Sequence, residues 1–301
     1  MKSDIRTLDL NLLKTLDALL DERNVTRAAQ RLSLTQPAVS GMLNRLRDYF
    51  DDPLFVRTPH GIVPTLRARA MAAPIKQILS DIDILLKPAQ FDPLTETLTF
   101  TVAATDYALK AVIVPFIAAL RARAPGIRVR VVPVEPEQLT TQFEQGKIDL
   151  ALLTPDSTPD NLHNRPLYNE EYVCLMRHDH PDAHQALTLD RFCALEHVLV
   201  SYKGENFWGV TDDALADVGR KRQIGLSVSS FLVLPDILAI SEMIAVVPAR
   251  LAYTDPRMHV VSPPLPIAGF TKSMAWHERT HRDAAHQWLR NLVHATSQSK
   301  T

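Results

Sequence analysis

The stretch TRAAQRLSLTQPAVSGMLNRL, residues 26–46, constrains the fold most, because two short helical patterns flank a three-residue turn. Apolar residues recur at helical spacing in each half, first as Val25, Ala28, Ala29 and Leu32, then as Val39, Met42, Leu43 and Leu46. With a similar stripe in residues 9–21, they predict three helices around one small core. The small alanines let two helix axes approach closely. This arrangement favours a helix-turn-helix, whose second helix enters the DNA major groove.

The starts of the second and third helices are also encoded. We expect Thr26 to cap the second helix and Thr35 the third, where Pro37 falls in the first turn and loses no needed hydrogen bond. Burial of the apolar stripe leaves short polar groups on the outer face of the third helix, which are suited to base edges and phosphates. The alternative is a helical hairpin of purely structural use.

Charge is concentrated in this part of the chain. The whole chain has a net charge of −1, yet residues 23–69 hold eight arginines against three aspartates, a local net charge of +5. Every one of these cations is arginine, whose forked guanidinium suits phosphate better than lysine does. A solvated basic face is the alternative.

A hairpin is predicted next, in DDPLFVRTPHGIVPT. The β-prone runs 54–56 and 62–63 flank Pro59, His60 and Gly61, which favour a tight turn. After a recognition helix such a hairpin is a wing, and Arg57 on it would face the DNA backbone or the minor groove. A solvated arginine is the alternative.

Residues 65–87 predict a long helix with a coiled-coil seam, through which we expect two protomers to pair. Apolar residues alternate spacings of four and three at Met71, Ile75, Ile78, Ile82 and Leu85. Pro74 should kink or loosen this helix. The alternative is a helix packed on its own domain. Two prolines within residues 88–93 then mark a domain boundary.

The rest of the chain alternates strand and helix patterns, which predicts a parallel, doubly wound sheet. Strands are expected in LTFTVAA, IRVRVVPV and IDLALLT, with helices at 107–123 and 136–145. A second set follows EEYVCLMRHDHP, with strands near 197–201, 223–229 and MIAVVP and a helix near 231–241. The segment TKSMAWH and a helix at 281–297 close the chain.

Composition and motifs argue against other classes of protein. The two cysteines, Cys174 and Cys193, lack metal-site or disulfide spacing, so we expect packed, reduced thiols. The histidines of RHDHPDAHQ lack a completing ligand set, and no nucleophile elbow or phosphate-binding loop occurs. We therefore expect no enzyme, no metal and no cofactor. A solute-binding protein would need an export signal, and no signal or membrane-spanning pattern is present.

The N-terminal segment resembles the DNA-binding segment of LysR-type transcriptional regulators. The similarity lies in the paired alanines of the second helix, the TQPAVS start of the third and the wing sequence DPLFVR. The C-terminal sequence WHERTHRDAAHQWLR resembles a branch that includes nodulation and aromatic-degradation regulators.

The resemblance implies an α+β multidomain chain. It would have a winged helix-turn-helix in residues 1–64, a linker and dimerisation helix in 65–90, and in 91–301 an α/β effector-binding domain of two subdomains, like a periplasmic solute-binding protein. Subdomain I would comprise 94–166 and 267–301, and subdomain II 167–266. The implied partners are double-stranded DNA at inverted-repeat promoter sites, a small-molecule effector that modulates DNA binding or bending, further copies of the chain in a dimer of dimers, and RNA polymerase. The expected location is the cytoplasm.

The resemblance also assigns site residues. The DNA contacts would be Thr35, Gln36, Pro37, Ser40, Asn44, Arg47 and, on the wing, Arg57. Ligands of open α/β sheets bind beyond the carboxyl ends of the strands. The effector would therefore contact Thr105, Asp106, Thr154, Ser201, Tyr202, Trp208, Ser229 and Phe231.

The charge of the effector is the open point of this assignment. The Thr105 hydroxyl and nearby free amides suit a carboxylate, whereas Asp106 would repel one unless it points away or a cation such as Lys203 offsets it. Hydroxyls at strand ends also act as helix caps, which is the alternative role for Thr105 and Thr154.

Overall fold

The computed structural model of the 301-residue chain describes residues 8–59, 61–86, 91–201, 207–252 and 255–298. The chain divides into two compact units, residues 1–89 and 90–301. Within the described ranges, no helix has both the length and the apolar character needed to cross a membrane.

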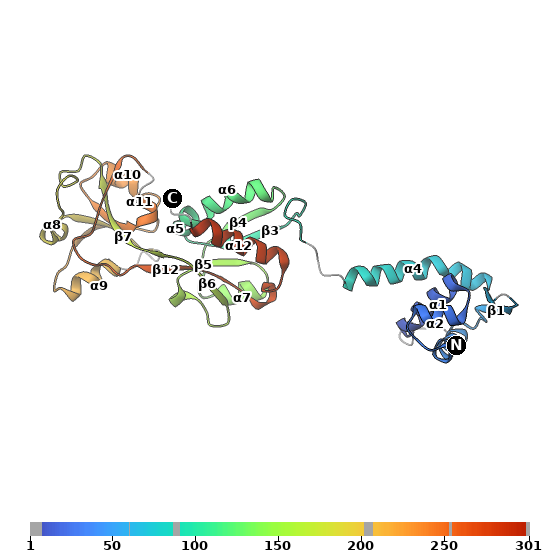
Figure 1. Ribbon diagram of the computed structural model, residues 1–301. Helices are drawn as coiled ribbons and strands as arrows, with labels where there is room; N and C mark the ends of the chain where they lie inside the picture. The colour runs from blue at the N-terminus through green and yellow to red at the C-terminus, as the bar shows by residue number, and fades with distance from the viewer. Residues whose placement is uncertain (1–7, 60, 87–90, 202–206, 253–254, 299–301) are drawn as a thin grey trace. The chain divides into compact units, whose positions relative to one another are not determined.

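The N-terminal unit is a three-helix core followed by a hairpin and a long helix (Figure 1). Leu16, Leu19, Val39 and Leu46 are fully buried, which confirms that the three short helices share one core. The elements are α1 (Leu10–Glu22), α2 (Val25–Arg31), α3 (Gln36–Phe50), β1 (Phe55–Thr58), β2 (Gly61–Pro64) and α4 (Leu66–Leu86).

One of the two predicted helix caps is correct. The Thr35 hydroxyl accepts a hydrogen bond from the backbone N–H of Ala38 at the start of α3. The prediction for Thr26 is wrong, because α2 begins at Val25 and Asn24 caps it by accepting from the N–H of Arg27. Asparagine is the stronger capping residue, so the helix starts two residues earlier than a cap at Thr26 would give.

The predicted wing is present as an antiparallel pair in which Arg57 lies opposite Ile62. The backbone N–H of Ile62 donates to the carbonyl of Arg23 at 3.0 Å, so the hairpin is attached to the end of α1. Gly61 has φ +131°, and a Cβ there would lie 2.6 Å from the same carbonyl oxygen. Glycine is therefore required at this turn.

The predicted seam of α4 is divided between two environments. Ile75 is buried, and Met71 and Leu79 pack beside it on the core of the N-terminal unit. For the first half of the helix, the alternative of packing on its own domain is therefore the correct one. Beyond it, apolar residues are exposed, and Leu85 retains 82 % exposure. Pro74 lies within the helix.

The second unit contains two five-stranded sheets, ordered β4-β3-β5-β12-β6 and β11-β7-β10-β8-β9. The first comprises β3 (Thr99–Ala103), β4 (Arg128–Val132), β5 (Leu150–Leu153), β6 (His163–Glu170) and β12 (Phe270–Trp276). The second comprises β7 (Tyr172–Arg177), β8 (Glu196–Val200), β9 (Gln223–Val228), β10 (Ile244–Pro248) and β11 (Met258–Val261).

Both sheets are mixed, so the prediction of a parallel sheet is wrong in part. Strands β3, β4 and β5 are parallel, but β12 runs antiparallel to β5 and β6, and β7 antiparallel to β10. The chain passes from β6 to β7 through Glu171 alone. Parallel neighbours need a long crossover connection between the two strands. The strands that enter a sheet from the other one, β7 and β12, pair antiparallel with their neighbours instead.

Helices cover both faces of the first sheet (Figure 1). Helices α6 and α12 share a core cluster with Phe100 and Met274, and α7 packs in a separate cluster with Ala103 and Ala275. The predicted helix 107–123 is three consecutive pieces, with a π-helical turn at Leu109–Ile113. The helices are α5 (Asp106–Ala108), α6 (Val114–Arg123), α7 (Leu139–Glu144), α8 (Leu189–Ala194), α9 (Val210–Asp217), α10 (Leu234–Ala239), α11 (Ala249–Ala252) and α12 (Ala284–Gln298).

Candidate functional site

The outer face of α3 is exposed and polar. Val39, Leu43 and Leu46 are buried on the inner face. On the outer face, exposed side chains come from Gln36, Pro37, Ser40 and Asn44. A Cβ built on exposed Gly41 would meet nothing within 4 Å, so the chain leaves open space at this position. The described geometry matches a helix that presents short polar groups to a DNA groove.

Arg47 is positioned differently from the other predicted DNA contacts. Its side chain is tied to the protein: Nε donates to the carbonyl of Pro53 at 2.9 Å, and a terminal nitrogen donates to Oδ1 of Asn44 at 3.1 Å. A further hydrogen bond reaches the carbonyl of Phe55 at 3.4 Å. Arg47 therefore holds the wing against α3, and only its remaining N–H groups can face DNA.

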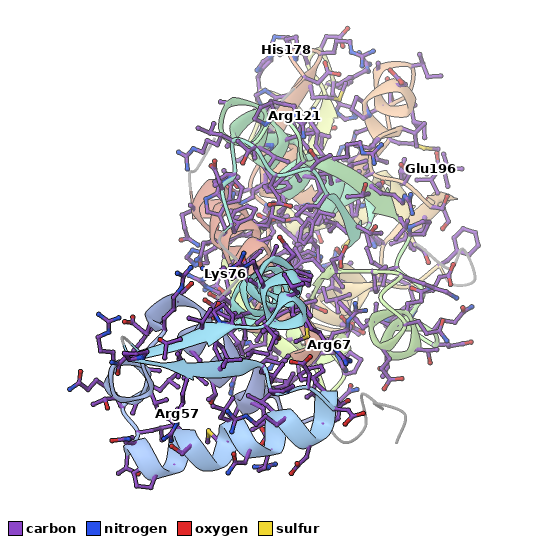
Figure 2. The ribbon with its side chains drawn as sticks, turned by 90° about the vertical axis from the view of Figure 1, so that its right-hand side faces the viewer. Arg57, Arg67, Lys76, Arg121, His178 and Glu196 are labelled. Carbon is purple, nitrogen blue, oxygen red and sulfur yellow. The ribbon has the colours of Figure 1, made fainter. Side chains whose placement is uncertain are left out.

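Acidic residues of the first helix and its cap neutralise part of the basic surface. Arg31 pairs with Asp21 at 2.9 Å, and Arg45 pairs with Asp9 at 3.4 Å. Lys76 of α4 also contacts Asp21, and hydrogen bonds from Lys76 and Arg31 lower the pKa of this carboxyl. Arg57 on the wing is exposed and has no ion pair within the described part of the chain (Figure 2). Arg57 is therefore a cation available for phosphate.

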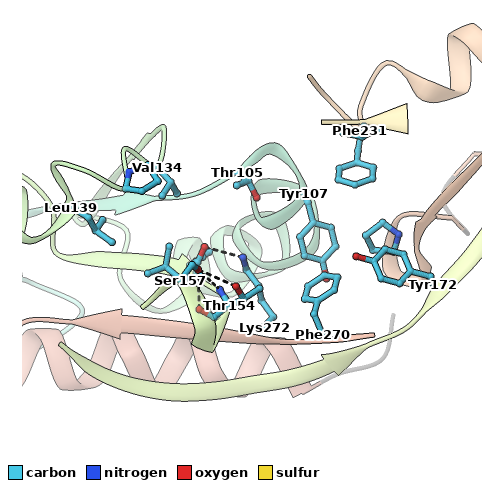
Figure 3. A pocket seen from close by; sticks show the side chains of 15 residues that line it. Thr105, Tyr107, Val134, Leu139, Thr154, Ser157, Tyr172, Phe231, Phe270 and Lys272 are labelled. Carbon is cyan, nitrogen blue, oxygen red and sulfur yellow. Dashed lines mark hydrogen bonds between the residues drawn. The ribbon is translucent and has the colours of Figure 1, made fainter. Parts of the chain in front are cut away.

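The second unit contains a cavity of about 430 Å³ that side chains from both sheets line (Figure 3). It opens at the carboxyl ends of β3, β4 and β5, where ligands of such sheets bind. The lining residues are Thr105, Tyr107, Val134, Pro136, Leu139, Leu152, Leu153, Thr154, Ser157, Tyr172, Val200, Phe231, Pro248, Phe270 and Lys272. This size and mainly apolar lining suit a small organic molecule.

Lys272 provides the cavity's positive charge. Its residue is only 4 % exposed, and Nζ donates to the backbone carbonyl of Leu152 at 2.9 Å. The ammonium lies 5.8 Å from the centroid of the Tyr107 ring. Burial lowers the pKa of Lys272 to about 8. Figure 3 shows Lys272 between the Thr154 and Ser157 hydroxyls and the aromatic rings.

A network of phenols begins at Tyr107, which lines the cavity. The Tyr107 hydroxyl donates to the buried carboxylate of Glu170 and lies 2.9 Å from the Tyr168 hydroxyl. Burial raises the pKa of Tyr107, and it raises that of Tyr168 to about 12, so both phenols remain neutral. The Arg250 guanidinium carbon lies 3.6 Å from the centroid of the Tyr168 ring. This network connects the first sheet to α11 of the second.

Three of the predicted effector residues line the cavity: Thr105, Thr154 and Phe231. Two of them also have local structural roles. The Thr105 hydroxyl accepts from the backbone N–H of Ala108 and caps α5. The Thr154 hydroxyl lies 3.0 Å from that of Ser157. Thr105 and Thr154 therefore act at helix starts and line the cavity at the same time.

Other predicted effector residues lie outside the wall. The Asp106 carboxylate accepts from the backbone N–H of Phe231 at 2.6 Å, so its charge is directed to the backbone rather than to a ligand. Trp208 is 57 % exposed and donates to Asp213. Ser201 and Ser229 are not part of the lining. Tyr202 and Lys203 lie outside the described residues.

The sequence analysis missed several polar and aromatic residues of the cavity wall on β7, β12 and α5. Tyr172, Phe270 and Lys272 belong to this group, as does Tyr107 of α5. The available signal was the lysine within the strand FTKSMAW, because lysine is almost never fully buried unless its charge is paired. Cys174 is buried and free, and burial raises the pKa of its thiol to about 12.

The fold and these two sites define a class: a DNA-binding regulator with a helix-turn-helix unit and a separate α/β ligand-binding unit. Family models agree with each part. The bacterial regulatory helix-turn-helix protein of the lysR family matches residues 10–69, and the LysR substrate binding domain matches residues 95–298. The chain belongs to the LysR family of transcriptional regulators, and it is not an enzyme.

Known relatives cover nearly the whole chain. The HTH-type transcriptional activator NahR of Pseudomonas putida is 36 % identical over 294 residues, 96 % of this chain and 98 % of the relative. Nodulation protein D 1 of Bradyrhizobium sp. (strain NC92) is 31 % identical over 95 % of this chain and 92 % of its own length. The crystal structure of the probable transcriptional regulator PA0477 from Pseudomonas aeruginosa matches with TM-score 0.61 and 31 % identity, over 96 % of this chain and 97 % of that one. The expected relation to nodulation regulators is confirmed.

Proposed function

We propose that the outer face of α3 and the wing read double-stranded DNA at inverted-repeat promoter sites. Gln36, Ser40 and Asn44 would contact base edges, with Thr35 and Pro37 beside them at the start of the helix. Arg57 would contact phosphate, and Arg47 mainly positions the wing. The observation that supports this most directly is the exposed polar face of α3 opposite its buried stripe.

The phosphate role of Arg57 is tested by the salt dependence of DNA binding. Each phosphate contact adds about one unit to the slope of log affinity against log salt. R57A should weaken binding uniformly across DNA sequences and reduce the slope by about one. R128A, which removes an exposed arginine of the second unit, is the matched control. An R57A slope equal to that of the unmodified protein and of R128A would contradict the assignment.

For the cavity, we infer an effector that is mostly apolar and carries one anionic group. The apolar lining and the buried ammonium of Lys272 support this class, since a buried cation is stabilised by an anion that replaces its lost hydration. The Thr154 and Ser157 hydroxyls lie near Lys272. Ser157 donates to the carbonyl of Thr154 at 3.0 Å, so the Thr154 hydroxyl is the one that can donate to the same group. Phe231, Phe270 and Tyr172 would hold the apolar part.

A thermal-shift screen of small aromatic and aliphatic carboxylates tests the effector class. A ligand that raises the melting temperature of the unmodified protein should bind K272M at least tenfold more weakly, because methionine keeps the volume but not the charge. K147M, at an exposed lysine, is the control. If uncharged analogues bind as tightly as the carboxylates, the proposed charge is wrong.

The larger assembly is also part of the proposal. We infer two subdomains built on the two sheets, with subdomain I near residues 94–166 and 267–301 and subdomain II near 167–266. Strand β6 remains paired in the first sheet up to Glu170, so the passage to the second follows that residue. Closure around the effector would change DNA binding or bending in a dimer of dimers that contacts RNA polymerase, in the cytoplasm where promoters lie.

A further inference from the structure

A cluster of metal-ligating side chains lies outside both sites described above. In the strand pair β6–β12, His163 is opposite Trp276. The turn Glu278–Thr280 follows after His277, and it brings Glu278 and His281 to the same place. Each of His163, Glu278 and His281 has one ligand atom within 4.8 Å of those of the other two.

We propose that His163, Glu278 and His281 bind a divalent first-row transition cation such as Zn²⁺. Imidazole nitrogens and a carboxylate oxygen are common zinc ligands, and three protein ligands leave a position for water. The three residues come from two chain segments that the strand pairing holds together, so the ligand set does not depend on one flexible loop.

The arrangement is close to a binding geometry but has to open slightly. Nε2 of His163 and Oε2 of Glu278 are 2.5 Å apart, whereas two ligands on one zinc ion are separated by about 3.4 Å at usual bond lengths. The Glu278 side chain is mostly exposed and can move outward. The His163 and His281 rings are stacked with centroids 4.1 Å apart, and they must tilt because a cation lies in the plane of each ring it binds.

Trp276 makes this site observable. Its ring stacks on His163 with centroids 5.6 Å apart, and its Nε1–H donates to Nδ1 of His281 at 3.1 Å. Coordination through Nδ1 would displace this hydrogen bond. Coordination through Nε2 would move the ring proton to Nδ1, which also removes the acceptor. Either mode of binding therefore changes the surroundings of the Trp276 indole.

The proposed cation site is separate from the cavity. The pairing of β6 with β12 begins at His163 opposite Trp276 and ends at Glu170 opposite Phe270, which lines the cavity. Six residue steps of an extended strand span about 20 Å. The two ligands would thus occupy opposite ends of the same strand pair.

Calorimetric titration of the full chain with ZnCl₂ tests the proposal. We expect H163A and H281A each to lose one zinc equivalent per chain, and E278Q to bind at that site at least tenfold more weakly. E144Q is the carboxylate control. H184A is the histidine control, because the rings of His178, His184 and His259 form another surface group with centroids 5.3–6.1 Å apart.

Quenching of tryptophan fluorescence by Ni²⁺ provides a second readout. Quenching should saturate in the unmodified protein and in H184A, and it should be lost in H281A. Circular dichroism checks that each variant is folded. E278Q changes an exposed side chain, so it still tests the proposal if a histidine variant unfolds. Zinc binding that is absent in the unmodified protein, or unchanged in H163A, H281A and E278Q, would overturn the proposal.

Discussion

Gly41 lowers the stability of α3 in the free protein, and we expect it to leave space for DNA in the complex. Glycine in a helix interior is less favourable than alanine by about 1 kcal/mol, yet nothing in the chain occupies the space of the missing side chain. We expect G41A to raise the free energy of unfolding by about 0.5–1 kcal/mol and to weaken DNA binding, because the added methyl group meets the approaching duplex. Denaturant melts and fluorescence anisotropy measure the two effects. A stabilised variant that retains full DNA affinity would show that this face stays clear of DNA.

The affinity for the effector should depend on pH, because the charge of Lys272 does. Burial lowers its pKa to about 8, so the side chain is charged below that pH and neutral above it. An anionic effector requires the ammonium form, and its affinity should therefore fall as the pH rises through about 8, by up to about tenfold per unit. Calorimetry across pH 6.5–9.5 measures this, with K272M expected to give a flat profile. A profile in the unmodified protein as flat as that of K272M would contradict the role of Lys272.

The cavity residues that could be predicted from sequence are marked by their neighbours in the chain, whereas those that were missed are placed by long-range strand pairing. Thr154 follows β5 directly and Thr105 lies two residues after the end of β3, so strand ends are enough to select them. Phe270 and Lys272 enter the cavity only because β12 returns from the second sheet and pairs between β5 and β6. No spacing in the sequence encodes that return. For the same reason the hydrogen bonding of Asp106 could not be predicted, because its carboxylate accepts from a backbone N–H 125 residues away.

At the scale of elements, the order of strands and helices is largely predictable, but edges and directions are not. Strand β6 was missed because its sequence HNRPLYNE is polar and contains Pro166. It lies at the edge of the first sheet, where proline and polar residues are tolerated. The antiparallel direction of β12 could not be inferred either, because local patterning is the same for both directions.

The exposed end of α4 is the element most directly tied to assembly. Ile84, Leu85 and Leu86 are all strongly exposed in the isolated chain. If a second protomer covers them, L85E should shift the protein toward monomers, since a buried carboxylate without a partner is costly. D81K, which changes charge at an exposed position of the same helix, should leave assembly intact. Light scattering after size-exclusion chromatography gives the masses, and equal masses for L85E and D81K would exclude pairing at this end.

At the scale of the whole molecule, the second sheet should limit stability in acid. His197 is fully buried, with Nε2 hydrogen-bonded to the carbonyl of Phe192, and burial lowers its pKa to about 4. Below an unfolded pKa of about 6.5 the unfolded chain takes up a proton that the folded chain does not, so stability falls between pH 6.5 and 4. The loss is about 3 kcal/mol at most. Urea melts at several pH values should show a smaller loss for H197Q, and an identical pH dependence would contradict this.

The central claim is that α3 and the wing bind specific DNA while the second unit remains a separate ligand-binding unit. A DNase footprint of the full chain on the DNA upstream of its own gene, across a salt series, tests it most directly. The matched variant S40R places a bulky side chain on the exposed face of α3 and should keep its melting temperature. We predict a protected inverted repeat for the unmodified protein that weakens steeply with salt and is absent for S40R. Equal protection by both proteins, or only diffuse protection at low salt, would contradict the account.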